Sequence, residues 1–76
     1  MSSLETRQAL GLALRAARRE SGKSQKVVAE EIGISQHALS YYEAGQREPT
    51  FPALLRLLDA VGLDLAEAAR IVRDGG

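Results

Sequence analysis

The stretch from Ser24 to Glu43 constrains the fold of this chain more than any other part of the sequence. It contains two short segments with apolar residues at helical spacing, one on each side of Gly33. Ser24 and Ser35 each precede a segment, where a hydroxyl can accept a hydrogen bond from the free backbone amides of a new helix. Gly33 lies where the first segment must end, because glycine adopts the left-handed conformation without steric cost. Two short helices joined so tightly are expected to pack at a steep angle, as a helix-turn-helix unit.

Several positions in and after this stretch resemble the signature of the Cro/repressor (XRE-type) helix-turn-helix family. They are Gln25, Ala29, Gly33, Leu39, Glu43, Gly45 and Pro49. The family consists of small DNA-binding domains found in phage repressors, restriction-modification controllers and antitoxins, and the resemblance covers residues 7 to 63. It implies an all-α fold, a compact five-helix lambda-repressor-like domain whose second and third helices form the helix-turn-helix. It also implies double-stranded DNA as the ligand.

Helical periodicity and capping residues predict five helices in a single domain that spans residues 1–76. Ser2 and Glu5 have the spacing of a capping box at the start of the first helix, and Asp64 and Glu67 have it at the start of the last. Thr50 is the expected N-cap of the fourth. The expected helices span about residues 4–21, 25–32, 36–44, 51–61 and 65–73.

Composition limits the environment and the partners of the chain. No cysteine is present, so the core or a partner subunit must stabilise a domain of 76 residues without disulfides. The sequence shows no signal peptide and no membrane-spanning apolar run, so we expect a cytoplasmic location and no membrane partner. Ten basic and ten acidic residues argue mildly against DNA binding. However, residues 1–29 contain six basic and two acidic residues (+4), whereas residues 30–76 contain four and eight (−4), so one face can be cationic.

The third expected helix carries the candidate base-reading residues. Its spacing turns Leu39 and Tyr42 toward the core. The residues left on the outer face are Gln36, His37, Ser40 and Tyr41. In the family that the chain resembles, this helix lies in the major groove and its N-terminal residues read base edges. Glutamine can form two hydrogen bonds with adenine, and histidine and tyrosine can also contact bases. The alternative for His37 is an exposed ring without a contact.

Polar residues around the helix-turn-helix are candidates for phosphate contacts. Gln25 is the expected first residue of a helix, where a backbone amide and a side chain can meet a phosphate oxygen. The resemblance supports this role and places Arg47 where family members touch the DNA backbone. Solvated surface positions are the alternative for Gln25, Arg47 and Arg15. The full candidate set is Gln25, Lys26, Ser35, Arg47 and Arg15. The resemblance also implies an ion pair between Arg18 and Glu43, which would join the first helix to the third.

The last expected helix has more apolar surface than a short terminal helix normally buries against its own domain. One interpretation is that it caps the core. The other, which we favour, is a homodimer interface. The candidate interface consists of Leu55, Leu58, Leu65, Ala68, Ile71 and Val72. Symmetric dimers of the family read two half-sites roughly 34 Å apart.

Together these features predict a sequence-specific transcriptional regulator, a small dimeric repressor that reads a palindromic operator. The alternative is an antitoxin or another interaction module that binds a toxin-like protein and autoregulates its operon, using the acidic C-terminal half and the apolar last helix. We set an enzyme aside, because the sequence lacks cysteine, a second histidine and a phosphate-binding glycine motif. The same lack of ligands argues against a metal site. We expect no cofactor, and no small-molecule effector because no ligand domain follows the helix-turn-helix.

Overall fold

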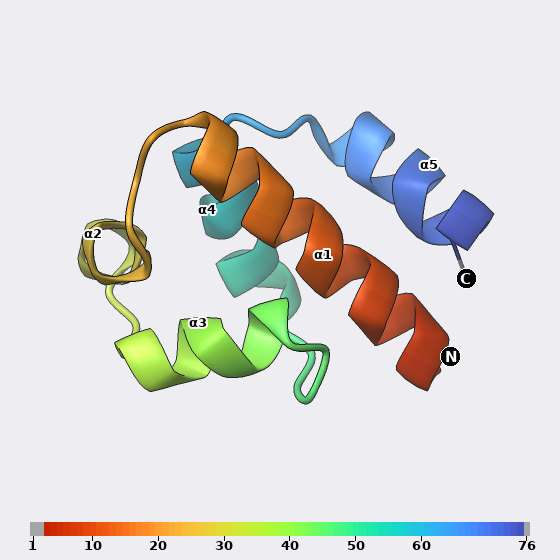
Figure 1. Ribbon diagram of the computed structural model, residues 1–76, viewed down its shortest axis with the longest axis horizontal. Coiled ribbons are helices and arrows are strands. Elements are labelled where there is room, and N and C mark those ends of the chain that lie inside the picture. Colours follow the sequence, from red (N-terminus) through yellow and green to blue (C-terminus); the bar gives the residue numbers. More distant parts are fainter. Residues whose placement is uncertain (1–2, 76) are drawn as a thin grey trace.

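The computed structural model describes residues 3–75, which form five α-helices joined by short turns (Figure 1). The helices are α1 (Leu4–Glu20), α2 (Gln25–Ile32), α3 (Gln36–Glu43), α4 (Phe51–Val61) and α5 (Leu65–Gly75). The predicted all-α class is confirmed, and the ends of α1, α3 and α5 differ from the predicted ends by one or two residues. Within residues 3–75, no helix has the length and the apolar character needed to cross a membrane.

Hydroxyl side chains begin three of the helices as predicted. Ser24, Ser35 and Thr50 each accept a hydrogen bond from the backbone amide three residues further on, at 3.1, 3.0 and 3.3 Å. Each bond satisfies an amide that has no partner inside its helix. Gly33, with φ of 77°, ends α2 in the left-handed conformation. The tight turn between α2 and α3 therefore follows from local sequence alone.

The other two helices begin somewhat differently from the prediction. Ser3 caps α1 by accepting a hydrogen bond from the Thr6 amide at 3.1 Å. The cap was predicted at Ser2, which lies outside the described residues. Helix α5 begins directly after Asp64 as predicted, but the Asp64 carboxylate accepts a hydrogen bond from the amide two residues further on, that of Ala66, at 2.7 Å. Both side chains perform the capping function, because short polar groups reach the first free amides of a helix.

Helix α1 is the central element of the fold. It contacts α3, α4 and α5, whereas α2 contacts α3 and α4. In Figure 1, α5 lies along one side of α1 and α3 lies on the other. This arrangement leaves α3 at the edge of the molecule, with one side free.

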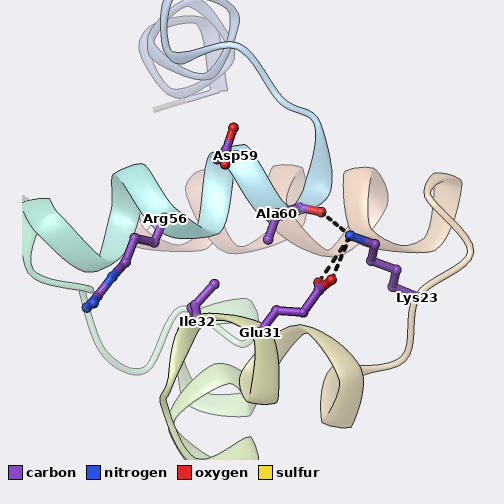
Figure 2. A pocket seen from close by; sticks show the side chains of 6 residues that line it. All are labelled: Lys23, Glu31, Ile32, Arg56, Asp59 and Ala60. Atoms are coloured by element: carbon purple, nitrogen blue, oxygen red, sulfur yellow. Dashed lines mark hydrogen bonds and ion pairs between the residues drawn. The ribbon is translucent and has the colours of Figure 1, made fainter.

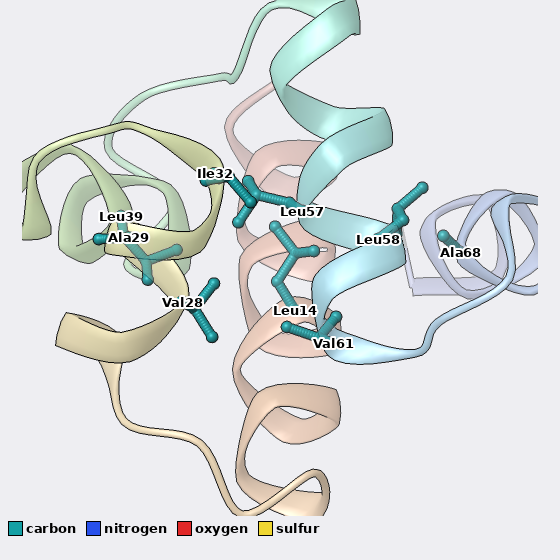
Figure 3. Packing of buried hydrophobic residues seen from close by; sticks show 9 residues of the cluster. All are labelled: Leu14, Val28, Ala29, Ile32, Leu39, Leu57, Leu58, Val61 and Ala68. Carbon is teal, nitrogen blue, oxygen red and sulfur yellow. The ribbon is translucent and has the colours of Figure 1, made fainter.

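Apolar side chains from all five helices form one core (Figure 3). Leu14, Val28, Leu39 and Leu57, from α1, α2, α3 and α4, are almost completely buried. The full cluster comprises Leu14, Val28, Ala29, Ile32, Leu39, Leu57, Leu58, Val61 and Ala68. Burial of a leucine side chain contributes about 1.5–3 kcal/mol, so this cluster supplies the stability that disulfides do not.

Two residues predicted to lie in a dimer interface belong to this core. Leu58 and Ala68 are each only 3% exposed within the single chain. Leu58, on α4, belongs to the core cluster, and Ala68 is covered because α5 folds back along α1. Their place in a dimer interface stays a prediction. The other predicted members keep accessible surface: Leu55, Leu65, Ile71 and Val72.

Gly11 allows α1 and the end of α3 to approach closely. A Cβ atom at this position would lie 2.5 Å from the carbonyl oxygens of both Tyr42 and Glu43. Contacts this short with backbone atoms cannot be relieved by side-chain rotation, so only glycine fits without moving a helix. This close approach brings Glu43 within reach of Arg18, further along α1.

Candidate nucleic-acid interface

A buried ion pair joins α1 to the last residue of α3. Arg18 Nε donates to Glu43 Oε2 at 2.6 Å, and Arg18 Nη2 donates to Glu43 Oε1 at 3.0 Å. The two side chains are 10% and 4% exposed. Arg18 Nη1 also donates to the Lys23 carbonyl at 3.0 Å. The hydrogen bonds with Glu43 raise the pKa of Arg18 above its ordinary value and outweigh burial, which lowers it. The ion pair implied by the family resemblance is thus present, and it fixes α3 relative to α1.

Gln25 extends this network to α2. Its Nε2 donates to Glu43 Oε1 at 3.0 Å, so one carboxylate accepts hydrogen bonds from side chains of α1 and α2. The sequence predicted a phosphate contact for Gln25 and gave no sign of this bond. The bond uses one of the two N–H groups of the amide and orients the side chain at the first position of α2.

The four candidate base-reading residues have exposed side chains on α3. They are Gln36, His37, Ser40 and Tyr41. Leu39 and Tyr42 lie on the other side, where Leu39 is buried and Tyr42 packs against the core, as predicted. A shallow hollow of about 270 Å³ is lined by Gln25, Gln36, His37 and Ser40. The first residue of α2 therefore lies beside the outer face of α3.

Tyr41 organises the turn that follows α3. The Arg47 guanidinium lies over its ring, 5.0 Å from the centroid. The Tyr41 carbonyl accepts hydrogen bonds from the backbone amides of Gln46 at 3.0 Å and of Arg47 at 3.4 Å. Both the ring and the backbone of one α3 residue thus position Arg47. No spacing rule predicts this contact, because it crosses an irregular turn.

The remaining four candidate phosphate-binding residues are exposed. Lys26 is exposed in the first turn of α2, and Arg47 is exposed in the loop after α3. The Ser35 hydroxyl accepts a hydrogen bond from the Ala38 amide at 3.0 Å and thereby caps α3. Arg15 is exposed on α1. These residues come from α1, from α2 and from the two ends of α3.

Arg15 lines a groove between α1 and α3, which we call the α1–α3 groove. Its volume is about 360 Å³, and it is lined by Arg15, Arg18, Arg19, Gln25, Ser40, Glu43 and Ala44. Arg19 was not among the predicted contacts. The sequence held no signal that separates it from a solvated arginine, because its position depends on how α3 packs against α1.

A different charged pocket lies between α2 and α4 (Figure 2). Its volume is about 430 Å³, and it is lined by Lys23, Glu31, Ile32, Arg56, Asp59 and Ala60. Lys23 Nζ donates to Glu31 Oε1 at 3.1 Å and to the Ala60 carbonyl at 2.9 Å, which links the α1–α2 turn to both helices. Positive and negative side chains are balanced here, so this pocket offers no net charge to attract a nucleic acid.

Comparison of the sequence with known proteins also identifies a helix-turn-helix family. The family described as "Helix-turn-helix domain" matches residues 9–71. The uncharacterized HTH-type transcriptional regulator y4dJ of Sinorhizobium fredii is 36% identical over 64 residues, which cover 84% of this chain and 83% of that protein. The HTH-type transcriptional regulator ImmR of Bacillus subtilis is 42% identical over 48 residues, which cover 63% of this chain and 38% of ImmR.

Two solved structures have a similar fold. The clp gene regulator ClgR from Corynebacterium glutamicum gives a TM-score of 0.84 at 30% identity, over 92% of this chain and 90% of that chain. The restriction-modification controller protein C.AhdI from Aeromonas hydrophila gives 0.74 at 28% identity, over 80% and 92%. Fold, helix-turn-helix geometry and family match agree, and the chain belongs to the Cro/repressor (XRE-type) helix-turn-helix family of DNA-binding transcriptional regulators.

Proposed function

We propose that this protein is a repressor that binds a palindromic operator as a homodimer, with α3 in the major groove. The observation that carries the proposal is a polar, exposed face of α3 on a helix that the core and a buried ion pair hold in place. A fixed helix loses little conformational freedom when it binds, so its polar side chains can discriminate between bases.

Within this proposal, Gln36 forms two hydrogen bonds with an adenine, and His37 and Ser40 contact neighbouring base edges. Phosphates are bound by Lys26, Arg47 and the free N–H group of Gln25, together with Arg15. The Ser35 oxygen already accepts a bond from Ala38, and its own O–H can donate to a phosphate oxygen.

The dimer part of the proposal rests on an apolar hollow beside α5. This hollow has a volume of about 210 Å³ and is lined only by apolar residues: Leu10, Leu54, Leu65, Ala68, Ala69 and Val72. Leu65 is 45% exposed at its edge, and Leu55 of α4 is 41% exposed. Apolar side chains from a second copy would fill the hollow and remove this surface from water.

The test is a titration of labelled DNA from the region upstream of the protein's own gene, beside scrambled DNA of equal length, at several salt concentrations. We expect the upstream DNA to bind at least about a thousandfold more tightly, the margin that specific recognition normally exceeds. Equal affinity for the upstream DNA, for a library of random duplexes and for the scrambled DNA would contradict the proposal.

The alternative is a module that binds a toxin-like protein and autoregulates its operon. It is favoured by a second apolar surface, a groove of about 550 Å³ between α1 and α5 where Leu12 is 62% exposed. A toxin-like reading frame beside the gene, together with a stable complex of the two purified proteins, would support this function. The repressor proposal instead expects a stable homodimer without any partner.

A further inference from the structure

The α1–α3 groove has a net positive charge. Glu43 is the one acid among the described residues that line it. Its Oε2 accepts from Arg18 Nε, and its Oε1 accepts from Arg18 Nη2 and Gln25 Nε2. Arg18 therefore neutralises this carboxylate. The charges of Arg15 and Arg19 are left uncompensated at the groove.

Arg15 and Arg19 are available to an external ligand. Both side chains are exposed, and neither forms an ion pair with a carboxylate of residues 3–75. They lie four residues apart on α1 and therefore project from the same side of the helix. Two exposed guanidinium groups on one side of a helix suit an anion with several oxygen atoms, such as a phosphodiester.

The groove continues into the outer surface of α3. Gln25 and Ser40 line the α1–α3 groove and also line the hollow that contains Gln36 and His37. A duplex that presents its major groove to these α3 residues brings a flanking sugar–phosphate strand close to α3, because the major groove is only about 12 Å wide. The two arginines of α1 border the surface along which that strand would run.

We propose that the α1–α3 groove binds DNA phosphates through Arg15 and Arg19, and that Arg19 is a backbone contact. The proposal rests on the proposed function, since it requires α3 to face the duplex. It adds Arg19 to the contact already proposed for Arg15 and makes the groove beside α3 a phosphate site on α1. It also explains how a chain of zero formal net charge presents a cationic surface to DNA.

The experiment compares Arg19→Gln, Arg15→Gln and the matched control Arg56→Gln, an exposed arginine of α4 at the charged pocket between α2 and α4. Dissociation constants are measured for operator and scrambled DNA over a range of salt concentrations. Each α1 variant should lower the slope of log affinity against log salt by about 0.9, and by the same amount on both DNAs. If the variant and the unaltered protein have equal affinity at 1 M salt, this slope change lowers the affinity of the variant at 0.1 M salt roughly eightfold. Arg56→Gln should leave the slope unchanged.

The variants also separate failure of this inference from failure of the proposed function. Arg19→Lys should restore most of the slope, because lysine also binds phosphate as a point charge. An unchanged slope for Arg19→Gln and Arg15→Gln, while Lys26→Gln lowers it, would overturn the phosphate site on α1 and leave the proposed function intact. Binding of the unaltered protein that shows no salt dependence on any DNA would overturn both.

Discussion

The guanidinium of Arg47 lies 5.0 Å from the centroid of the Tyr41 ring, so a residue of the loop rests on a residue of α3. The sequence suggested separate roles for these two, with Tyr41 at a base and Arg47 at a phosphate. Their contact couples the two roles, because a change at the ring alters the position of the cation. An arginine stacked on an aromatic ring also loses less side-chain freedom when it binds a phosphate.

The first prediction separates the ring of Tyr41 from its hydroxyl. Tyr41→Phe keeps the aromatic platform, so we expect little change in affinity for scrambled DNA. Tyr41→Ala removes the platform and should weaken binding to all DNA. A double-mutant cycle of Tyr41→Ala and Arg47→Gln, measured on the affinity for scrambled DNA, should give a coupling free energy of about 0.5–1 kcal/mol. This is the size of an exposed cation–π contact. If Tyr41→Phe instead weakens only operator binding, and does so at one base pair, the hydroxyl reads a base.

The second prediction concerns base reading by α3. Gln36→Ala should weaken operator binding by about 1–3 kcal/mol and relax the preference at one base pair, because the adenine loses its two hydrogen bonds. Lys26→Gln is the matched control, since loss of a phosphate contact should weaken operator and scrambled DNA alike. Titrations against a set of single-base operator variants measure both effects. Unaltered operator affinity for Gln36→Ala would place the base-reading surface elsewhere.

The third prediction concerns the ion pair of Arg18 and Glu43. Arg18→Met should lower the free energy of unfolding by about 3–5 kcal/mol, because it leaves the Glu43 carboxylate buried without a counter-charge. The double variant with Glu43→Leu should lose less than this single variant, since no isolated charge remains buried. Urea unfolding followed by circular dichroism gives both values. A loss below about 1 kcal/mol for Arg18→Met would mean that water screens the pair.

The pKa of Arg18 determines the pH range over which the arginine stays charged and can hold this ion pair. Its pKa is higher in the folded chain than its ordinary value. A group with a raised folded pKa contributes stability that is complete below its unfolded pKa and is lost only as pH rises through the folded pKa. Arg18 should therefore stay charged from acid to moderately alkaline pH. Any loss of stability within that range must come from other groups.

The sequence was sufficient for features that depend on neighbouring residues. The serine caps at positions 24 and 35 and the left-handed Gly33 are local, so their types and spacing predicted α2, the turn and α3. The contacts of Gln25 with Glu43 and of Arg47 with Tyr41 depend on how separate elements pack. No helical or strand period relates those pairs.

The burial of Leu58 and Ala68 within the single chain was not predicted, for a similar reason. An apolar stripe shows that a helix must bury one side, but periodicity does not say whether its own domain or a second copy covers that side. In the structure α5 lies along α1, so part of the stripe is internal while Leu65 stays 45% exposed. The surplus of apolar surface was a correct observation. Only the fold shows which of these apolar residues lie in the core and which stay on the surface.

The fourth prediction tests the close approach at Gly11. Alanine is favoured over glycine inside a helix by about 1 kcal/mol, yet Gly11→Ala should lower the free energy of unfolding by about 1–3 kcal/mol. The new methyl would meet the carbonyl oxygens of Tyr42 and Glu43 at 2.5 Å. Ala16→Gly, at an exposed position of α1, reports only the difference in helix propensity between alanine and glycine. It should lower the free energy of unfolding by about 1 kcal/mol. A stabilising effect of Gly11→Ala would show that α1 and α3 can separate at low cost.

The fifth prediction concerns the apolar surface of the proposed dimer, either the hollow beside α5 or the groove between α1 and α5. Leu65→Lys places a charge at the edge of the hollow beside α5, and we expect it to convert a homodimer to a monomer, because burial of an unpaired ammonium is costly. Leu12→Lys is the matched control on the groove between α1 and α5, and it should leave the dimer intact. Both leucines are exposed, so neither change should disturb the core. Sedimentation velocity over a range of protein concentrations distinguishes the species. Dissociation by Leu12→Lys alone would move the interface to the groove between α1 and α5, and the operator half-site spacing would then have to be derived from that geometry.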